Sequence, residues 1–190
     1  MKIIKNTLSE KMITILKKSI GKRLLSFSYD YHFDDKNTAN SNGVEFNFDN
    51  KKIILYSDLK YFDILSGDDY SYLAICEEED EIFSKLNSYP KKEKIAINQI
   101  IQDIQIVTDN YHLINEEQNI DEYFISDYAI IFIFDDYKIC FEKFDIYEDD
   151  LEISKTSLSK DFSFFDNSED FENPDCYKTE RNRTIKSIKE

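Results

Sequence analysis

One β-hairpin sequence occurs twice in this chain, and the repeat restricts the folds that the chain can adopt. Residues 46–55 read FNFDNKKIIL, and residues 132–141 read FIFDDYKICF. Both follow F-x-F-D-[N/D]-x-K-I-x-[L/F], in which apolar residues flank a pair of polar turn formers. Each copy therefore predicts a strand, a tight turn and a second strand.

Residues upstream of the hairpins also correspond, which extends the repeat to larger units. The corresponding pairs, offset by 80 residues, are Ile20 and Ile100, Leu24 and Ile104, Phe27 and Val107, Tyr31 and Tyr111, and His32 and His112. The hairpins are offset by 86 residues, so the second copy is expected to have a longer connecting loop. We therefore expect an α+β fold of internally duplicated units, each a helix plus an antiparallel β-sheet. A pseudo-twofold axis would relate the units, and strand content should exceed helix.

The repeat divides the chain into three segments. Residues 1–77 form the first unit, with helix, strand, loop and hairpin, and residues 78–153 form the second unit. Residues 154–190 form an acidic and aromatic C-terminal segment with a basic end, which either pairs with the acidic body or frays. We expect one globular domain overall, and the pattern leaves open whether the units form one sheet or two.

The first unit begins with the strongest helix signal in the chain. Thr7-Leu8-Ser9-Glu10 has the form of a capping box with Thr7 at the N-cap, and Gly21 marks the helix end. Residues 23–33 alternate, which predicts one strand with Ser26 and Ser28 on a half-exposed face. Residues 34–43 are turn formers and predict a polar loop. The helix is expected to pack on a sheet through an apolar face made of Leu8, Met12, Ile15, Leu16 and Ile20.

The second unit contains weaker helix and stronger strand signals. Apolar residues between positions 82 and 89, before Pro90, predict a short helix that follows an acidic run. Residues 94–107 predict one or two strands. Residues 123–134 end in a run without polar residues, which is typical of a strand at the centre of a sheet that is covered on both faces.

Composition excludes several classes of protein. With 41% hydrophobic and 15% aromatic residues, 190 residues suffice for a substantial core. Only three glycines are present, which argues against glycine-rich phosphate loops. No apolar run approaches the roughly 18 residues of a membrane span, and residues 1–5 are too short to begin a signal peptide. We therefore expect a cytoplasmic location.

The three cysteines, Cys76, Cys140 and Cys176, lack the spacing of a metal site. Cys76 and Cys140 lie in apolar strand-like runs, where a free thiol packs as a small hydrophobic group. We expect reduced thiols and no metal or other cofactor.

Charge is distributed unevenly along the chain. The net charge is −15, but residues 1–25 carry +6 and residues 178–190 carry +3, which leaves −24 in residues 26–177. Such a field repels nucleic acid and anionic membranes and accelerates encounter with basic proteins. Solubility alone is the alternative explanation.

The sequence contains no recognised catalytic motif, and we assign no catalytic residue. His32 and His112 each follow a tyrosine at equivalent repeat positions, which duplication explains without a shared site. No HExxH, HxH or cysteine cluster accompanies them. The acidic runs lack the spacing of a calcium-binding loop.

In size, acidity and lack of a catalytic motif, the chain is similar to bacterial immunity proteins, which neutralise cationic toxin domains such as nucleases, and to phage inhibitors that imitate nucleic acid charge. The similarity implies a non-enzymatic protein that occludes a basic protein partner. Two alternatives stay open: a small-ligand-binding protein or enzyme with His32 and His112 between the units, and a structural or oligomerising domain, such as a homodimer. The predicted partner-binding residues are Glu78, Glu79, Asp80, Glu81, Glu148, Asp149, Asp150 and Glu152.

Overall fold

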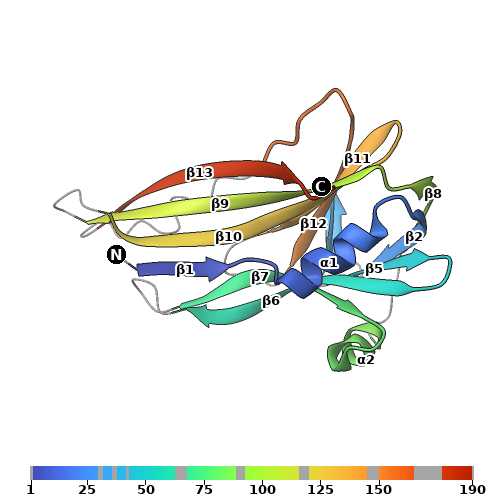
Figure 1. The fold of residues 1–190 in the computed structure, drawn as a ribbon, viewed down its shortest axis with the longest axis horizontal. Helices are drawn as coiled ribbons and strands as arrows, with labels where there is room; N and C mark the ends of the chain where they lie inside the picture. The colour runs from blue at the N-terminus through green and yellow to red at the C-terminus, as the bar shows by residue number, and fades with distance from the viewer. Residues whose placement is uncertain are drawn as a thin grey trace.

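The computed structural model contains two β-sheets and two short helices, so the α+β class and the excess of strand over helix are confirmed (Figure 1). The strands at one end extend well beyond the helices, which gives the molecule an elongated shape. The structure describes residues 2–29, 32–35, 38–41, 43–62, 68–88, 93–115, 120–144, 150–164 and 177–189.

The larger sheet has eight strands in the order β13-β9-β10-β11-β12-β4-β3, with β1 beside β10. All of its described pairings are antiparallel except that of β1 with β10. Its strands are β1 (Lys2–Asn6), β3 (His32–Asp35), β4 (Thr38–Ser41), β9 (Asp103–Asn115), β10 (Ile120–Ile133), β11 (Tyr137–Lys143), β12 (Leu151–Ser157) and β13 (Tyr177–Ser187).

The smaller sheet has five antiparallel strands in the order β7-β6-β5-β2-β8. Its strands are β2 (Arg23–Tyr29), β5 (Gly43–Phe48), β6 (Lys52–Phe62), β7 (Asp68–Glu77) and β8 (Glu93–Ile100), and the helices are α1 (Glu10–Ser19) and α2 (Glu81–Asn87). The last passage of the chain from the smaller to the larger sheet is at residues 101–102, between β8 and β9.

Both predicted hairpins are present, and they have the same register. Phe46 pairs with Ile53 across β5 and β6, and Phe132 pairs with Ile139 across β10 and β11. The backbone N–H of the last residue before each turn donates to the carbonyl three residues later, over 3.0 Å in the first hairpin and 2.9 Å in the second. The two hairpins lie in different sheets.

Each hairpin has an antiparallel neighbour on both sides, in the orders β2-β5-β6-β7 and β9-β10-β11-β12. Only the second set is a meander of consecutive strands, because β3 and β4 lie between β2 and β5 in the chain. The flanking registers differ from the sequence alignment, because Phe46 faces Phe27 whereas Phe132 faces Ile104 rather than Val107. The boundary between residues 77 and 78 does not separate the sheets, because β1, β3 and β4 belong to the larger sheet and β8 to the smaller one. The structure therefore does not establish internal duplication.

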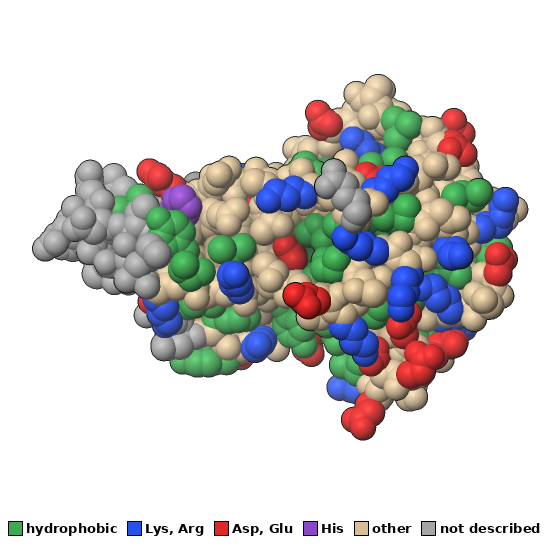
Figure 2. Space-filling model, in the orientation of Figure 1, with side chains coloured by type: hydrophobic (Ala, Val, Ile, Leu, Met, Phe, Trp, Pro, Cys, Tyr) green, Lys and Arg blue, Asp and Glu red, His purple; other side chains and the backbone are tan. Residues whose placement is uncertain are grey.

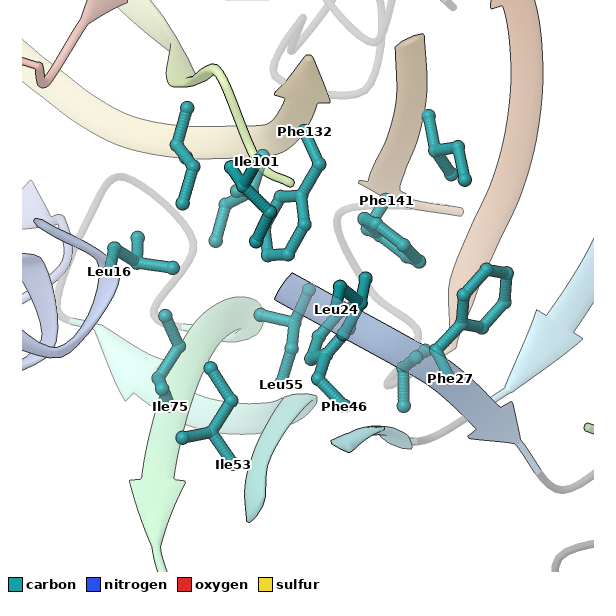
Figure 3. Close-up of a cluster of buried hydrophobic side chains, with 14 of the residues drawn as sticks. Leu16, Leu24, Phe27, Phe46, Ile53, Leu55, Ile75, Ile101, Phe132 and Phe141 are labelled. Atoms are coloured by element: carbon teal, nitrogen blue, oxygen red, sulfur yellow. The ribbon is translucent and has the colours of Figure 1, made fainter. Parts of the chain in front are cut away.

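The main core lies between the two sheets (Figure 3). Phe132 and Phe141 from the larger sheet meet Phe46 and Leu55 from the smaller sheet, and Leu16 of α1 joins them from one side. Strand β10 is central, as its apolar run predicts, because it pairs along both edges and its residues 128–132 are buried.

Helix α1 begins two residues later than the capping box predicts. Ser9 is the N-cap, and its Oγ accepts a hydrogen bond from the Met12 amide at 3.3 Å, so the assignment of Thr7 as the cap is wrong. Gly21 follows the helix with φ +77°, a left-handed conformation that glycine adopts without strain, which confirms the predicted stop.

Residues 23–43 differ most from the prediction. The expected single strand is divided into β2 and β3, which belong to different sheets. The expected polar loop contains the strand pair β3 and β4, because backbone pairing with β12 overrides the turn-forming composition. Ser26 and Ser28 are buried and not half-exposed.

Neither helix in the described part of the chain is long and apolar enough to cross a membrane.

Candidate interaction surface

The first group of predicted acidic residues, together with Glu77, forms an ordered acidic turn, residues 77–81, that leads into α2. Glu78, Glu79 and Glu81 are exposed, whereas Asp80 is directed back into the turn. The Asp80 Oδ2 atom accepts a hydrogen bond from the Glu77 amide at 2.9 Å, and its Oδ1 atom accepts one from Lys11 Nζ of α1. The Lys11 hydrogen bond is the main reason that the pKa of Asp80 is lowered.

This acidic turn is anchored to the body of the protein by α2 and by a second lysine. Phe83 is buried against the outer face of the smaller sheet, in a cluster that includes Ile54 and Cys76. Lys51 Nζ lies 3.8 Å from the Glu77 carboxylate. Figure 2 shows acidic side chains gathered over α2. Of the five carboxylates in residues 77–81, those of Glu77 and Asp80 are thus engaged by lysines, and the other three face solvent.

The second predicted acidic group has a different environment. Glu148 and Asp149 lie outside the described residues. Asp150 is half-buried, and its carbonyl accepts a hydrogen bond from the Phe144 amide at 3.0 Å. Glu152 on β12 is the direct cross-strand neighbour of Glu142 on β11.

Glu142 and Glu152 form a carboxyl pair that the sequence patterns did not indicate. Glu142 is only 6% exposed, and burial, followed by the neighbouring Glu152, raises its pKa to about 8. Burial also raises the pKa of Glu152. The pair therefore differs from the exposed acidic turn, and it lies in the other sheet.

A buried ion pair links the C-terminal strand to the larger sheet. Arg183 on β13 faces Asp109 on β9, and its Nε and Nη2 atoms donate to the two Asp109 carboxylate oxygens at 2.6 and 2.5 Å. The Tyr111 hydroxyl donates to the same carboxylate at 3.2 Å. The basic end therefore pairs with an acid of the body, which is one of the two possibilities that the sequence left open.

A second set of buried polar side chains lies where β1 and β11 diverge along the same edge of β10. Strand β9 pairs along one edge of β10, so β1 and β11 share the other edge, beside residues 122–126 and 129–133 respectively. Lys143, at the end of β11, is fully buried there and donates to the Ser71 carbonyl at 3.0 Å and to Ser126 Oγ at 2.8 Å. The Asn6 side-chain amide donates to the same two oxygens.

Asp127 fills the gap between the two pairings on that edge. Its carboxylate accepts hydrogen bonds from the Leu8 amide at 2.8 Å and from the Thr108 hydroxyl at 2.7 Å. Burial raises the pKa of Asp127. Hydrogen-bonded residues so distant in sequence cannot be paired from spacing alone, so no sequence signal indicated this group.

The two histidines lie on widely separated strands. His112 on β9 packs edge-on against Tyr123 of β10, with ring centroids 4.6 Å apart. His32 lies on β3, and strands β10, β11, β12 and β4 stand between β3 and β9 in the sheet. The His32 side chain is outside the described part of the structure.

The two cysteines in the described part of the chain are enclosed. Cys76 and Cys140 are free thiols and buried, as predicted, and burial raises the pKa of Cys76 to about 11. Cys176 lies outside the described residues. Within the described ranges, no group of three or more His, Cys, Asp or Glu side chains is arranged to hold a metal ion.

Comparison with family models, with curated proteins and with solved structures found no match to this chain. Functional inference therefore depends on its own residues.

Proposed function

We propose that this protein is a non-enzymatic binding protein that occludes a basic surface on another protein, as an immunity or inhibitor protein does. The observation that carries the proposal is the acidic turn, in which Lys11 and Lys51 engage two acids while Glu78, Glu79 and Glu81 stay exposed. The contacts of Asp80 and Glu77 fix the backbone of the turn, so less backbone entropy is lost when a cationic partner docks on the exposed carboxylates.

The net charge supports the same function, because it should increase the rate at which basic partners associate. At −15 the chain attracts basic partners over distances comparable to the Debye length, which is about 8 Å at physiological ionic strength. Association should therefore be fast at low salt and slower at high salt, with the acidic turn providing the short-range contacts.

The test is affinity capture of the tagged full-length protein in lysate of its own source cells, at about 50 and about 500 mM salt. The triple variant Glu78→Gln, Glu79→Gln and Glu81→Gln removes the exposed acids of the turn. The matched control, Asp49→Asn, Glu93→Gln and Asp136→Asn, removes the same charge from exposed positions elsewhere.

We expect one basic protein to be retained stoichiometrically by the wild type and by the control, to be weakened by salt, and to be lost from the turn variant. Retention that is equal in both variants would reject the turn as the contact. Absence of any partner at either salt concentration would reject occlusion of a basic protein.

A further inference from the structure

Residues 158–164 lie over the outer face of the larger sheet, the face opposite the smaller sheet, whereas β13 is the edge strand of that sheet. We call residues 158–164 the C-terminal clasp. Phe162 and Phe164 of the clasp pack against an apolar cluster on that face. The cluster consists of Val107, Tyr128, Ala129, Ile131 and Cys140.

Arg183 connects the clasp to the sheet as a latch. Besides its two hydrogen bonds to Asp109, its guanidinium carbon lies 4.4 Å from the ring centroid of Tyr128 and 4.9 Å from that of Phe164. One side chain thus joins β13, β9, β10 and residues 158–164. A second, weaker attachment is the ion pair of Lys138 with the exposed Asp161 at 3.6 Å.

The same face carries the carboxyl pair. Glu142 is two residues from Cys140 on β11, and its cross-strand partner on β10 is Ala129, so all three side chains share one side of the sheet. Glu152, as the partner of Glu142 on β12, lies on this side too. The clasp therefore covers the face on which two neighbouring carboxyl groups are placed.

Few cations can compensate these carboxyls. The charged and titratable groups that act on Glu142 are Glu152 from β12, which opposes its ionisation, and Arg183 from β13, which favours it. Arg183 is already engaged by Asp109. Cys140 of β11 and Tyr128 of β10 are the other titratable neighbours, and burial raises the pKa of both. Neutral Glu142 is thus favoured while the face is covered, in agreement with its raised pKa.

We propose that the C-terminal clasp is a releasable cover, latched by Arg183, that opens when the Glu142 and Glu152 pair ionises and thereby exposes the apolar outer face of the larger sheet. Opening hydrates both carboxylates, whereas closure requires that at least one of them keep its proton. The clasp contains no helix or strand and packs on the face opposite the main core, so its release leaves both sheets paired. This device is independent of the acidic turn.

A single fluorescent probe can follow the clasp, because the chain contains no tryptophan. Phe164→Trp places the probe beneath Arg183, and Leu158→Trp, at a position that is 46% exposed, gives the emission of a hydrated indole. Emission and far-UV circular dichroism are recorded together from about pH 5.5 to about pH 9.5, so that local opening is distinguished from unfolding.

We expect the indole emission of the Phe164→Trp protein to shift to longer wavelength as the pH rises toward 8 and to level off above it, with unchanged circular dichroism. Adding Glu142→Gln should abolish the shift, because a neutral amide cannot ionise. Adding Arg183→Gln should give the shifted emission already at the lowest pH, whereas Lys186→Gln on the same strand should not.

Two results would overturn the proposal. One is an emission maximum that stays constant across the pH range in the protein that carries only the probe. The other is a shift that persists in the Glu142→Gln protein or that occurs only together with loss of the circular dichroism signal.

Discussion

The ring of Phe46 on β5 stacks on the ring of Phe132 on β10, with centroids 4.8 Å apart and planes inclined by 24°. These residues occupy the same position of the hairpin motif in its two copies. Phe141 closes the group edge-on, 5.0 Å from Phe46 and 5.5 Å from Phe132. A pseudo-twofold axis between the hairpins would produce such a contact, but the flanking registers differ between the copies, so the axis stays a prediction.

The Phe46 and Phe132 pair should contribute strongly to the free energy of unfolding. Either Phe→Ala substitution should lower the free energy of unfolding by about 3–5 kcal/mol, because both rings are buried in the main core. A double-mutant cycle measured by urea unfolding should give a coupling energy of about 0.5–1.5 kcal/mol. Tyr61→Ala, at a position that is 61% exposed, is the control and should change stability by less than about 0.5 kcal/mol. Strict additivity of the two core substitutions would contradict a direct contribution of the stack.

Removing one member of the Asp109 and Arg183 pair should lower the free energy of unfolding more than replacing both members. Asp109→Asn should destabilise the protein by about 3–5 kcal/mol, since it leaves the guanidinium partly buried without its counterion. The double variant Asp109→Asn with Arg183→Met should recover part of that loss, because no unpaired charge remains. Chemical denaturation near neutral pH measures both. A double variant less stable than Asp109→Asn alone would contradict this expectation. It would show that Arg183 stabilises the protein mainly through its contacts with the Tyr128 and Phe164 rings.

Local signals in the sequence predicted the elements whose partners are close in the chain. The hairpins depend on a turn and on residues within ten positions of each other, and both are present with equivalent pairs. The apolar run of β10 likewise indicated its central position. The stop at Gly21 depends on one backbone conformation, and it was also predicted.

Features that depend on distant partners were not predictable. Residues 38–41 form a strand because β12, more than a hundred residues later, offers an edge. At the offset of 80 residues, the thirteen residues of β9 correspond to residues 23–35. Strand β9 is continuous, whereas residues 23–35 contain β2 and β3, which lie in different sheets. Of the predicted partner-binding acids, Glu152 is directed at Glu142, a relationship that spacing does not reveal.

Glu142 should make stability depend on pH. Its pKa is raised in the folded state to about 8 from 4.5, so the folded protein binds more protons than the unfolded chain between these values. The free energy of unfolding should therefore fall as the pH rises from about 5 to about 8, by on the order of 4 kcal/mol. Urea unfolding at a series of pH values should show this slope in the wild type and a much smaller slope in Glu142→Gln. An equal slope in the two proteins would assign the effect to other groups.

Lys143 should have the opposite effect at higher pH. Burial lowers the pKa of Lys143 from 10.5 to about 8, so between these values the unfolded chain binds more protons than the folded protein. Stability should therefore rise with pH from about 8 to about 10, and the wild type should have a minimum near pH 8. Lys143→Met should remove the rise without preventing folding, because Asn6 still donates to both the Ser71 carbonyl and Ser126 Oγ. The measurement is urea unfolding of wild type and Lys143→Met across this range, with Lys186→Gln as the control at an exposed lysine. A rise of equal size in Lys143→Met would show that Lys143 is not the group responsible.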